Sequence, residues 1–196
     1  MKERVGIYGG SFDPVHTGHL ILAREAREKL SLDRVLFVPA VVSPHKLERP
    51  PASAELRCRL IAAAIENEPG FELDTYEVDA GRDPSFSIDT VREIAGRLPE
   101  AELFYFIGDD NLPELHTWKS LSELRRIARF VVFSRQISSG NTVLEIPSDM
   151  LSVSRRIDIS STEIRNRIAS GKSIRYLMPE KVCSILQQEN SYQIQK

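Results

Sequence analysis

Short apolar runs alternate with helical patterns along the first 134 residues, and this alternation constrains the fold most. Apolar runs of strand length occur at 5–8, 35–38, 71–78, 103–107 and 130–133, with helical periodicity between them near 18–30, 53–67, 87–98 and 120–128. Strands separated by helices in this way are typical of a parallel sheet covered by helices. Ser120, followed three positions later by Glu123, predicts a capping box at the start of the last of these helices.

The pattern changes after Ser134. A polar stretch leads to a short apolar piece near 143–146, then to a helix from about residue 161 and a last helix opened by Pro179. The final residues, NSYQIQK, are expected to fray. We predict an α/β fold in a single domain over 1–196. A Rossmann-like, doubly wound parallel sheet flanked by helices takes up about 1–158, and a small C-terminal helical portion takes up about 159–190.

Charge and composition exclude several classes of protein. The formal net charge of -2 provides no general attraction for nucleic acid or an anionic membrane, so any anion recognition must be local. No apolar run reaches the roughly 18 residues needed to span a bilayer. The two cysteines, Cys58 and Cys183, each fall in an amphipathic pattern and are interpreted as core residues in a reducing compartment. A cytoplasmic protein is expected.

The first apolar run leads directly into GGSFDPVHTGH, residues 9–19. In a doubly wound sheet, ligands bind outside the carboxyl ends of the strands, which is where this segment lies. Glycines there let backbone N–H groups come close to a phosphate. Thr17 is the expected N-cap of the next helix, which puts His19 in its first turn and His16 just before it. Because a helix N-terminus favours anions, the segment is typical of a polyphosphate site.

Other interpretations of this segment explain less. H-x-x-H could bind a metal, but no further Cys, His or acidic cluster accompanies it at ligand spacing, so no direct protein ligand to a metal is predicted. The chain contains neither G-x-x-x-x-G-K-[ST] nor G-x-G-x-x-G. A purely structural loop would not need two imidazoles beside two glycines.

GGSFDPVHTGH resembles the signature of the nucleotidyltransferase superfamily whose members carry an H-x-G-H element after their first strand. ISSTEIRNRI, residues 159–168, is similar to that superfamily's C-terminal motif as found in pyridine-nucleotide adenylyltransferases. Together with SPHK (43–46), PSFSIDT (84–90) and GDDNLPELHTW (108–118), the resemblance covers nearly the whole chain. It is strongest to bacterial nicotinate-nucleotide adenylyltransferases. It implies transfer of AMP from ATP to nicotinate mononucleotide, giving deamido-NAD and pyrophosphate in NAD biosynthesis.

The C-terminal motif also makes physical sense without the resemblance. Ser160 is a candidate N-cap, and Glu163 would complete a capping box. The N–H groups of Ser161 and Thr162 would then point out of the helix start, with Arg165 one turn later. Alone, the segment fits an ordinary capped surface helix equally well. Paired with the first motif, it predicts a second set of phosphate contacts.

Adenylyl transfer to a phosphate needs positioning and charge neutralisation more than a base, because the attacking group is already an oxyanion. The resemblance implies that His16 and His19 stabilise the triphosphate and its transition state, and that Lys46 and Arg165 hold the β and γ phosphates. It also implies ATP contacts from Gly9, Gly10, Ser11, Phe12, Gly108, Asp110, Ser160, Ser161 and Thr162. Mg²⁺ is expected to accompany ATP. Asp13 would order the loop or reach the water shell of the metal.

Lys46 and His45 lie in a proline-marked loop after the second strand, which suits a cover over bound phosphates. Lys46 is also expected to contact the nicotinate nucleotide. A solvated basic loop is the alternative.

The segment that follows the fourth apolar run is expected to bind the second substrate. Trp118 could be a core residue, but its polar neighbours and the family resemblance favour stacking on a pyridine ring. Asp110 would bond a ribose hydroxyl, as the G-x-D element of the family implies, with Gly108 permitting close approach. Asp109 departs from that element, where a small residue is usual.

PSFSIDT is the expected site for the nicotinate carboxylate. Ser87 is predicted to cap a helix over 87–98, leaving backbone N–H groups at 86–88 for a small anion, with Thr90 nearby. Phe86 stands where the family often has Tyr. Simple helix capping is the alternative, and these residues do not by themselves separate nicotinate from nicotinamide.

Three other functions stay open at this point. Two are enzymes that adenylate nicotinamide mononucleotide or phosphopantetheine, and the third is a nucleotide-binding sensor without activity. Homo-oligomerisation is open as well.

Overall fold

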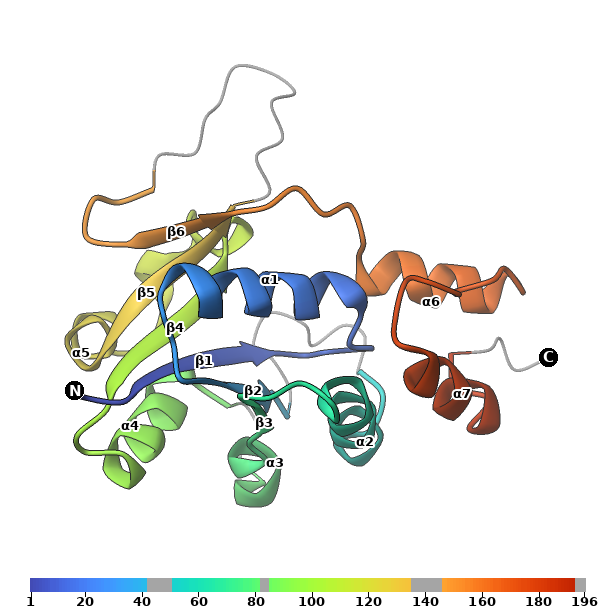
Figure 1. Cartoon of the computed structure of the whole chain (residues 1–196), viewed down its shortest axis with the longest axis horizontal. Coiled ribbons are helices and arrows are strands. Elements are labelled where there is room, and N and C mark those ends of the chain that lie inside the picture. Colours follow the sequence, from blue (N-terminus) through green and yellow to red (C-terminus); the bar gives the residue numbers. More distant parts are fainter. Residues whose placement is uncertain (42–50, 82–84, 135–145, 193–196) are drawn as a thin grey trace, which may run out of the picture.

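Six parallel strands form one sheet in the computed structural model, which describes residues 1–41, 51–81, 85–134 and 146–192 (Figure 1). The strands are β1 (Arg4–Gly10), β2 (Arg34–Pro39), β3 (Phe71–Leu73), β4 (Glu102–Gly108), β5 (Ala128–Ser134) and β6 (Leu151–Ser154). Their order in the sheet is β3-β2-β1-β4-β5-β6, and every neighbouring pair is parallel. The order reverses between β1 and β4, which confirms the predicted doubly wound α/β fold.

Helices cover both faces of the sheet (Figure 1). They are α1 (Thr17–Lys29), α2 (Ala54–Ile65), α3 (Tyr76–Ala80), α4 (Ser87–Arg97), α5 (Leu121–Ile127), α6 (Ser161–Ala169) and α7 (Glu180–Gln188), with short 3-10 helices at Asp109–Asn111 and Leu115–Thr117. In the described parts of the chain, none of them is long and apolar enough to cross a membrane.

Alternation along the strands divides the core between the two faces. On one face, Phe37 and Phe106 pack with residues of α1, α2, α6 and α7. On the other face, Val38 and Tyr105 pack with residues of α4 and α5. The division of the chain near residue 158 stays a prediction.

The third apolar run is shorter as a strand than predicted. Only Phe71–Leu73 pairs with β2, and residues 76–78 of the run belong to helix α3. Asp74 ends the strand because its Oδ1 accepts the N–H of Tyr76 over 3.0 Å, which turns the chain. Expecting a strand over 71–78 was therefore wrong beyond Leu73.

The capping box predicted at Ser120 is also wrong. Ser120 has a left-handed backbone (φ 53°), and its side chain makes no capping hydrogen bond. A capping side chain needs an extended backbone. Glu123 instead accepts hydrogen bonds from Arg92 of α4 over 2.6 and 2.9 Å, so its carboxylate points away from the helix start.

Strand β6 was not anticipated from the sequence. The apolar piece predicted near 143–146 lies outside the described residues except for Ile146, and β6 begins five positions later at Leu151. β6 adds to the edge of the sheet beside β5, and the chain then leads to α6.

Candidate active site

A cavity of about 660 Å³ lies at the carboxyl ends of β1 and β4, where the strand order reverses. Residues from both predicted motifs line it, although the motifs lie about 150 positions apart in the sequence. The predicted site residues that line it are Gly9, Gly10, Ser11, Phe12, His16, His19, Gly108, Asp110, Trp118, Ser160, Ser161, Thr162 and Arg165.

The two histidines of the first motif contact each other at the start of α1. His16 is the N-cap residue, and its ring stacks on that of His19 with centroids 3.7 Å apart. The His16 N–H donates to His19 Nδ1 over 3.2 Å, and the His19 N–H faces the His16 residue and donates to its carbonyl over 2.9 Å, in the arrangement of a capping box. Because Nδ1 of His19 accepts a hydrogen bond, the proton of the neutral ring lies on Nε2. That nitrogen is then a donor on a ring that lines the cavity.

Thr17, predicted as the N-cap, is instead the first helical residue. Its N–H donates to the carbonyl of Leu177 over 2.9 Å, and His16 takes the capping role. Gly18 makes this packing possible, because a Cβ there would lie 3.0 Å from Nδ1 and Cε1 of His16. The glycine therefore makes room for a histidine ring.

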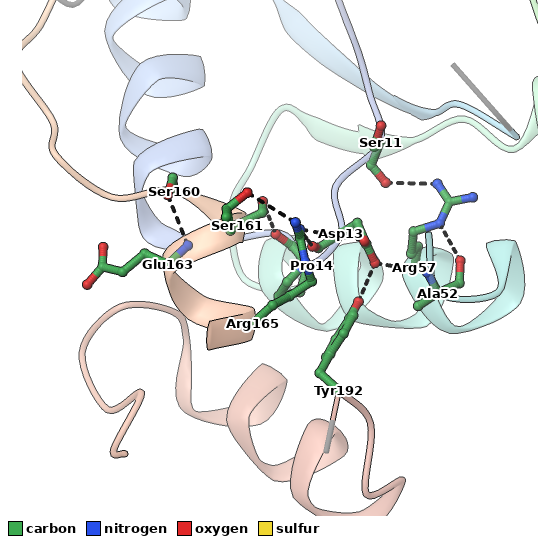
Figure 2. Close-up of polar contacts among 11 residues, drawn as sticks. Ser11, Asp13, Pro14, Ala52, Arg57, Ser160, Ser161, Glu163, Arg165 and Tyr192 are labelled. Atoms are coloured by element: carbon green, nitrogen blue, oxygen red, sulfur yellow. Dashed lines mark hydrogen bonds and ion pairs between the residues drawn. The ribbon is translucent and has the colours of Figure 1, made fainter. Parts of the chain in front are cut away.

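The second motif starts helix α6 beside the first motif (Figure 2). Ser160 is the N-cap as predicted, since its Oγ accepts the N–H of Glu163 over 3.1 Å. The Glu163 carboxylate lies 3.8 Å from Arg167. Ser161 Oγ donates to the carbonyl of Pro14 over 2.9 Å, which ties the start of α6 to the first motif.

Arg165 links the same two segments through its guanidinium. Nη1 donates to the carbonyl of Asp13 over 2.7 Å, and Nη2 donates to Oγ1 of Thr162 over 3.0 Å. The Asp13 carboxylate is 3.6 Å away, and the side chains of Arg165 and Asp13 are only 16% and 14% exposed. The guanidinium is therefore held in place at the cavity wall.

Asp13 orders the loop, one of the two roles expected for it. Its Oδ1 accepts hydrogen bonds from the N–H of Ala52 over 3.0 Å and from the hydroxyl of Tyr192 over 2.5 Å (Figure 2). The peptide bond between Asp13 and Pro14 is cis. Tyr192 belongs to the segment predicted to fray, so that prediction is wrong at this residue.

Arg57, in α2, is a buried cation that contacts the loop following β1. It is 1% exposed, and it donates to four carbonyl groups at 2.7–3.1 Å. These belong to Ser11, Ala40, Val41 and Ala52. Burial lowers the pKa of the guanidinium. Arg57 thus joins the ends of β1 and β2 to the start of α2.

Trp118 lies in the wall of the cavity. Its half-buried ring packs edge-on against Tyr105, with centroids 6.2 Å apart, and it also borders the cavity. It is thus part of the core and part of the site wall. Asp110 is exposed at the end of β4, and its Oδ1 would lie 2.2 Å from a Cβ at position 108, so the loop geometry requires Gly108. Asp110 also accepts a hydrogen bond from Asn111 over 3.0 Å.

The PSFSIDT segment differs from its predicted geometry. Phe86 is the N-cap of α4, and Ser87 is its first helical residue, so the capping prediction is wrong. The Ser87 Oγ instead accepts a hydrogen bond from the Tyr105 hydroxyl over 2.7 Å. Thr90 is buried and donates to Glu77 over 2.5 Å. These three residues of α4 and its cap are not among the described residues that line the cavity.

Lys46 and His45 lie outside the described residues. In the described ranges, no three His, Cys, Asp or Glu side chains come together as a metal site would require.

Several residues near the cavity were missed in the sequence. Tyr105, Asn111, Arg155 and Ile157 line it, and Arg57 and Tyr192 support it from behind. Arg57 could have been found, because it interrupts the apolar face of its helix. The others carry no local signal, since their roles depend on contacts between distant segments.

Comparisons with known proteins agree with this architecture. The family described as Cytidylyltransferase-like matches residues 7–167. A "Probable nicotinate-nucleotide adenylyltransferase" of Methylacidiphilum infernorum is 39% identical over 193 residues, covering 96% of this chain and 92% of the relative. A protein of the same name from Clostridium botulinum (strain Loch Maree / Type A3) is 35% identical and covers 95% of this chain and 97% of the relative.

Solved structures share the fold. Nicotinic acid mononucleotide adenylyltransferase of Plasmodium falciparum, complexed with NaAD, has a TM-score of 0.77 at 15% identity, with 97% of each chain covered. The similarity of both motifs, of nearly the full sequence and of the fold leads to one conclusion. The chain belongs to the cytidylyltransferase-like family and, within it, to the nicotinate-nucleotide adenylyltransferases.

Proposed function

We propose that this enzyme transfers the AMP part of ATP to nicotinate mononucleotide. A phosphate oxygen of the mononucleotide bonds to the α-phosphorus, and the bond from that phosphorus to the bridging oxygen breaks. Pyrophosphate leaves with the electron pair, and deamido-NAD forms without a protein nucleophile. The observation that carries the proposal is the convergence of two helix N-termini, both motif histidines and Arg165 on one cavity.

The phosphate side of the cavity supplies donors where negative charge would gather. His19 presents Nε2–H because its Nδ1 is occupied, and His16 stacks beside it. The start of α6, with Arg165 one turn later, suits the β and γ phosphates. Lys46 is proposed as a further contact to these phosphates. Such preorganised donors lower the barrier because they need no rearrangement as charge develops.

Mg²⁺ is proposed to enter with ATP. The donor set fits an ion held mainly by phosphate oxygens, because Asp13 is already bonded to Ala52, Tyr192 and Arg165. When bound, the ion would neutralise charge on the phosphate oxygens.

The acceptor is proposed to bind between Trp118 and the end of β4. Trp118 would stack on the pyridine ring, and Asp110 would bond a ribose hydroxyl. The start of α4 around Phe86 and Ser87 is the proposed contact for the nicotinate carboxylate, because a helix N-terminus favours an anion. Tyr105 joins this segment to the cavity through its bond to Ser87.

A competition between acceptors tests the proposal. Purified enzyme with Mg²⁺ and ATP would receive equal amounts of nicotinate mononucleotide, nicotinamide mononucleotide and phosphopantetheine, with products separated by mass. We expect deamido-NAD to dominate, with one pyrophosphate released per dinucleotide. Preference for another acceptor would change the assigned substrate. ATP binding without pyrophosphate release from any acceptor would identify a sensor.

A further inference from the structure

The turn after α7 contacts the loop that follows β1 through one hydroxyl group (Figure 2). Tyr192 follows α7, and its hydroxyl donates to Oδ1 of Asp13 over 2.5 Å, across 179 positions of sequence. The Tyr192 ring packs against the apolar cluster that α2 and α7 share. A segment at the far end of the sequence therefore bonds directly to a residue of the first motif.

Asp13 divides its oxygens between this hydroxyl and Arg165. Oδ1 accepts from Tyr192 and from the N–H of Ala52, while Oδ2 and the main-chain carbonyl face Nη1 of Arg165 at 3.6 and 2.7 Å. Both partners of the ion pair are mostly buried. With Oδ1 held by two donors, the carboxylate cannot rotate away from Arg165 without breaking hydrogen bonds.

Arg165 retains a donor that nothing in the described part of the chain uses. Its Nε is buried and has no hydrogen-bond partner there, whereas Nη1 and Nη2 are bonded to Asp13 and Thr162. The side chain lines the cavity. An unsatisfied buried donor costs about 1–3 kcal/mol, so a ligand oxygen that reached it would be favoured.

We infer that Tyr192 is a positioning residue for the triphosphate: its hydroxyl holds the Asp13 carboxylate, and Asp13 in turn holds Arg165 in its phosphate-binding orientation. This inference rests on the proposed function, because it takes Arg165 as a phosphate contact. Burial and the neighbouring Asp13 carboxylate raise the pKa of the Tyr192 hydroxyl, so it stays a proton donor at neutral pH.

Replacement of the hydroxyl tests the inference. For Tyr192→Phe we expect a loss of about fivefold to tenfold in kcat/KM for ATP and a matching rise in the Kd of Mg·ATP, with the KM for nicotinate mononucleotide unchanged. Tyr176→Phe is the matched control, because Tyr176 is 80% exposed and lies in the same C-terminal portion. A merely structural effect would alter the kinetics of both substrates. Equal effects on both substrates, or wild-type values in Tyr192→Phe, would overturn the inference.

A double-mutant cycle tests the route through Asp13. If Tyr192 acts through that carboxylate, adding Tyr192→Phe to Asp13→Asn produces little further loss, whereas independent effects would multiply and contradict the route. Hydrogen exchange of the unmodified enzyme provides a second test that needs no variant. Saturating Mg·ATP should slow exchange at the amides of Ser191 and Tyr192, because coupling between sites is reciprocal. No added protection there would also overturn the inference.

The two proposals fail in distinguishable ways. If the wild type binds Mg·ATP but forms no deamido-NAD, the proposed function fails, and the Kd ratio between the variants still decides the role of Tyr192. If Mg·ATP does not bind at all, both proposals are wrong.

Discussion

His16 and His19 orient each other before any ligand arrives. Each takes part in the capping of α1, and the bond from the His16 N–H to Nδ1 of His19 leaves Nε2 as the protonated nitrogen of a neutral His19 ring. Stacking on the His19 ring and close packing against Gly18 leave little freedom for the His16 ring. At the scale of single residues, a backbone group therefore selects the tautomer of a histidine that lines the cavity.

We predict that His19→Ala lowers kcat by about 10²–10³-fold while raising the Kd of Mg·ATP by less than about fivefold. The donor acts mainly on charge that develops in the transition state, and loss of one such donor typically has this effect. Single-turnover kinetics and calorimetric titration measure the two quantities. His116→Ala is the control, because His116 is exposed and does not line the cavity. Equal losses in kcat and in affinity would mean that His19 only binds the ground state.

Glu77 is a second residue whose protonation depends on the groups around it. Burial raises its pKa, although hydrogen bonds to its side chain oppose the shift. A carboxyl group with a raised folded-state pKa contributes stability that declines as pH rises from the unfolded value through the folded value. The free energy of unfolding should therefore fall as pH rises above about 4.5, by at most ~1.4 kcal/mol per pH unit from this group.

We expect Glu77→Gln to remove this part of the pH dependence, because glutamine keeps an acceptor for Thr90 but does not ionise. Urea unfolding at a series of pH values between 4.5 and 8 measures it. Glu100→Gln, at an exposed position, is the matched control and should leave the slope unchanged. Parallel pH profiles for Glu77→Gln and the wild type would contradict the prediction.

Two helices with similar start sequences differ in how they begin. Ser160 and Ser120 each precede a glutamate by three residues, but only Ser160 bonds the N–H at that position. The difference is in the backbone, since Ser160 is extended and Ser120 is left-handed. At the scale of elements, the C-terminal motif thus caps the N-terminus of α6 and also lines the cavity.

Alanine at the two serines should separate these cases. Ser160→Ala is predicted to lower the free energy of unfolding by about 1 kcal/mol, since a capping bond is lost. Ser120→Ala should change it by less than about 0.5 kcal/mol, since no capping bond exists there. Urea unfolding under identical conditions compares the two. Similar losses for both variants would show that the cap at Ser160 contributes nothing specific.

The cavity of the molecule lies where the strand order reverses, between β1 and β4. Hydrogen bonds from one buried side chain connect the segments that follow the neighbouring strands β1 and β2. Arg57 connects the carbonyl groups that end β1 and β2 with the start of α2. Buried carbonyl groups without a donor are costly, so this cation stabilises the segments that follow β1 and β2 and precede α2. Its location away from the cavity wall makes it a structural residue.

We predict that Arg57→Met lowers the free energy of unfolding by at least about 3 kcal/mol, because four carbonyl groups lose their donors. Arg57→Lys should rescue little of this, since an ammonium cannot reproduce the planar fork of the guanidinium. Arg59→Met on the same helix is the control. Its exposed ion pair with Glu189 should contribute less than about 1 kcal/mol. Comparable unfolding midpoints in urea for the two methionine variants would contradict this assignment.

Much of the fold was accessible from local patterns. The strands β1, β2, β4 and β5 and the helices between them lie close to their predicted ranges, because buried parallel strands and amphipathic helices carry strong periodic signals. The predicted length of β3 was too great and β6 was not predicted, because short polar turns and a four-residue edge strand carry weak periodic signals. The capping predictions failed at Thr17, Ser87 and Ser120, where tertiary contacts or backbone conformation overrode local preference.

By itself, the sequence determined the alternating α/β architecture, the two motifs GGSFDPVHTGH and ISSTEIRNRI whose residues line the cavity, and the family to which the chain belongs. These properties are encoded in short segments whose chemistry does not depend on distant residues. Only the tertiary structure decided that Arg57 and Tyr192 support the loop that follows β1 and that Tyr105 links α4 to the cavity. Each of these roles is a hydrogen bond between groups far apart in the chain, and such a bond exists only once packing has brought its donor and acceptor together.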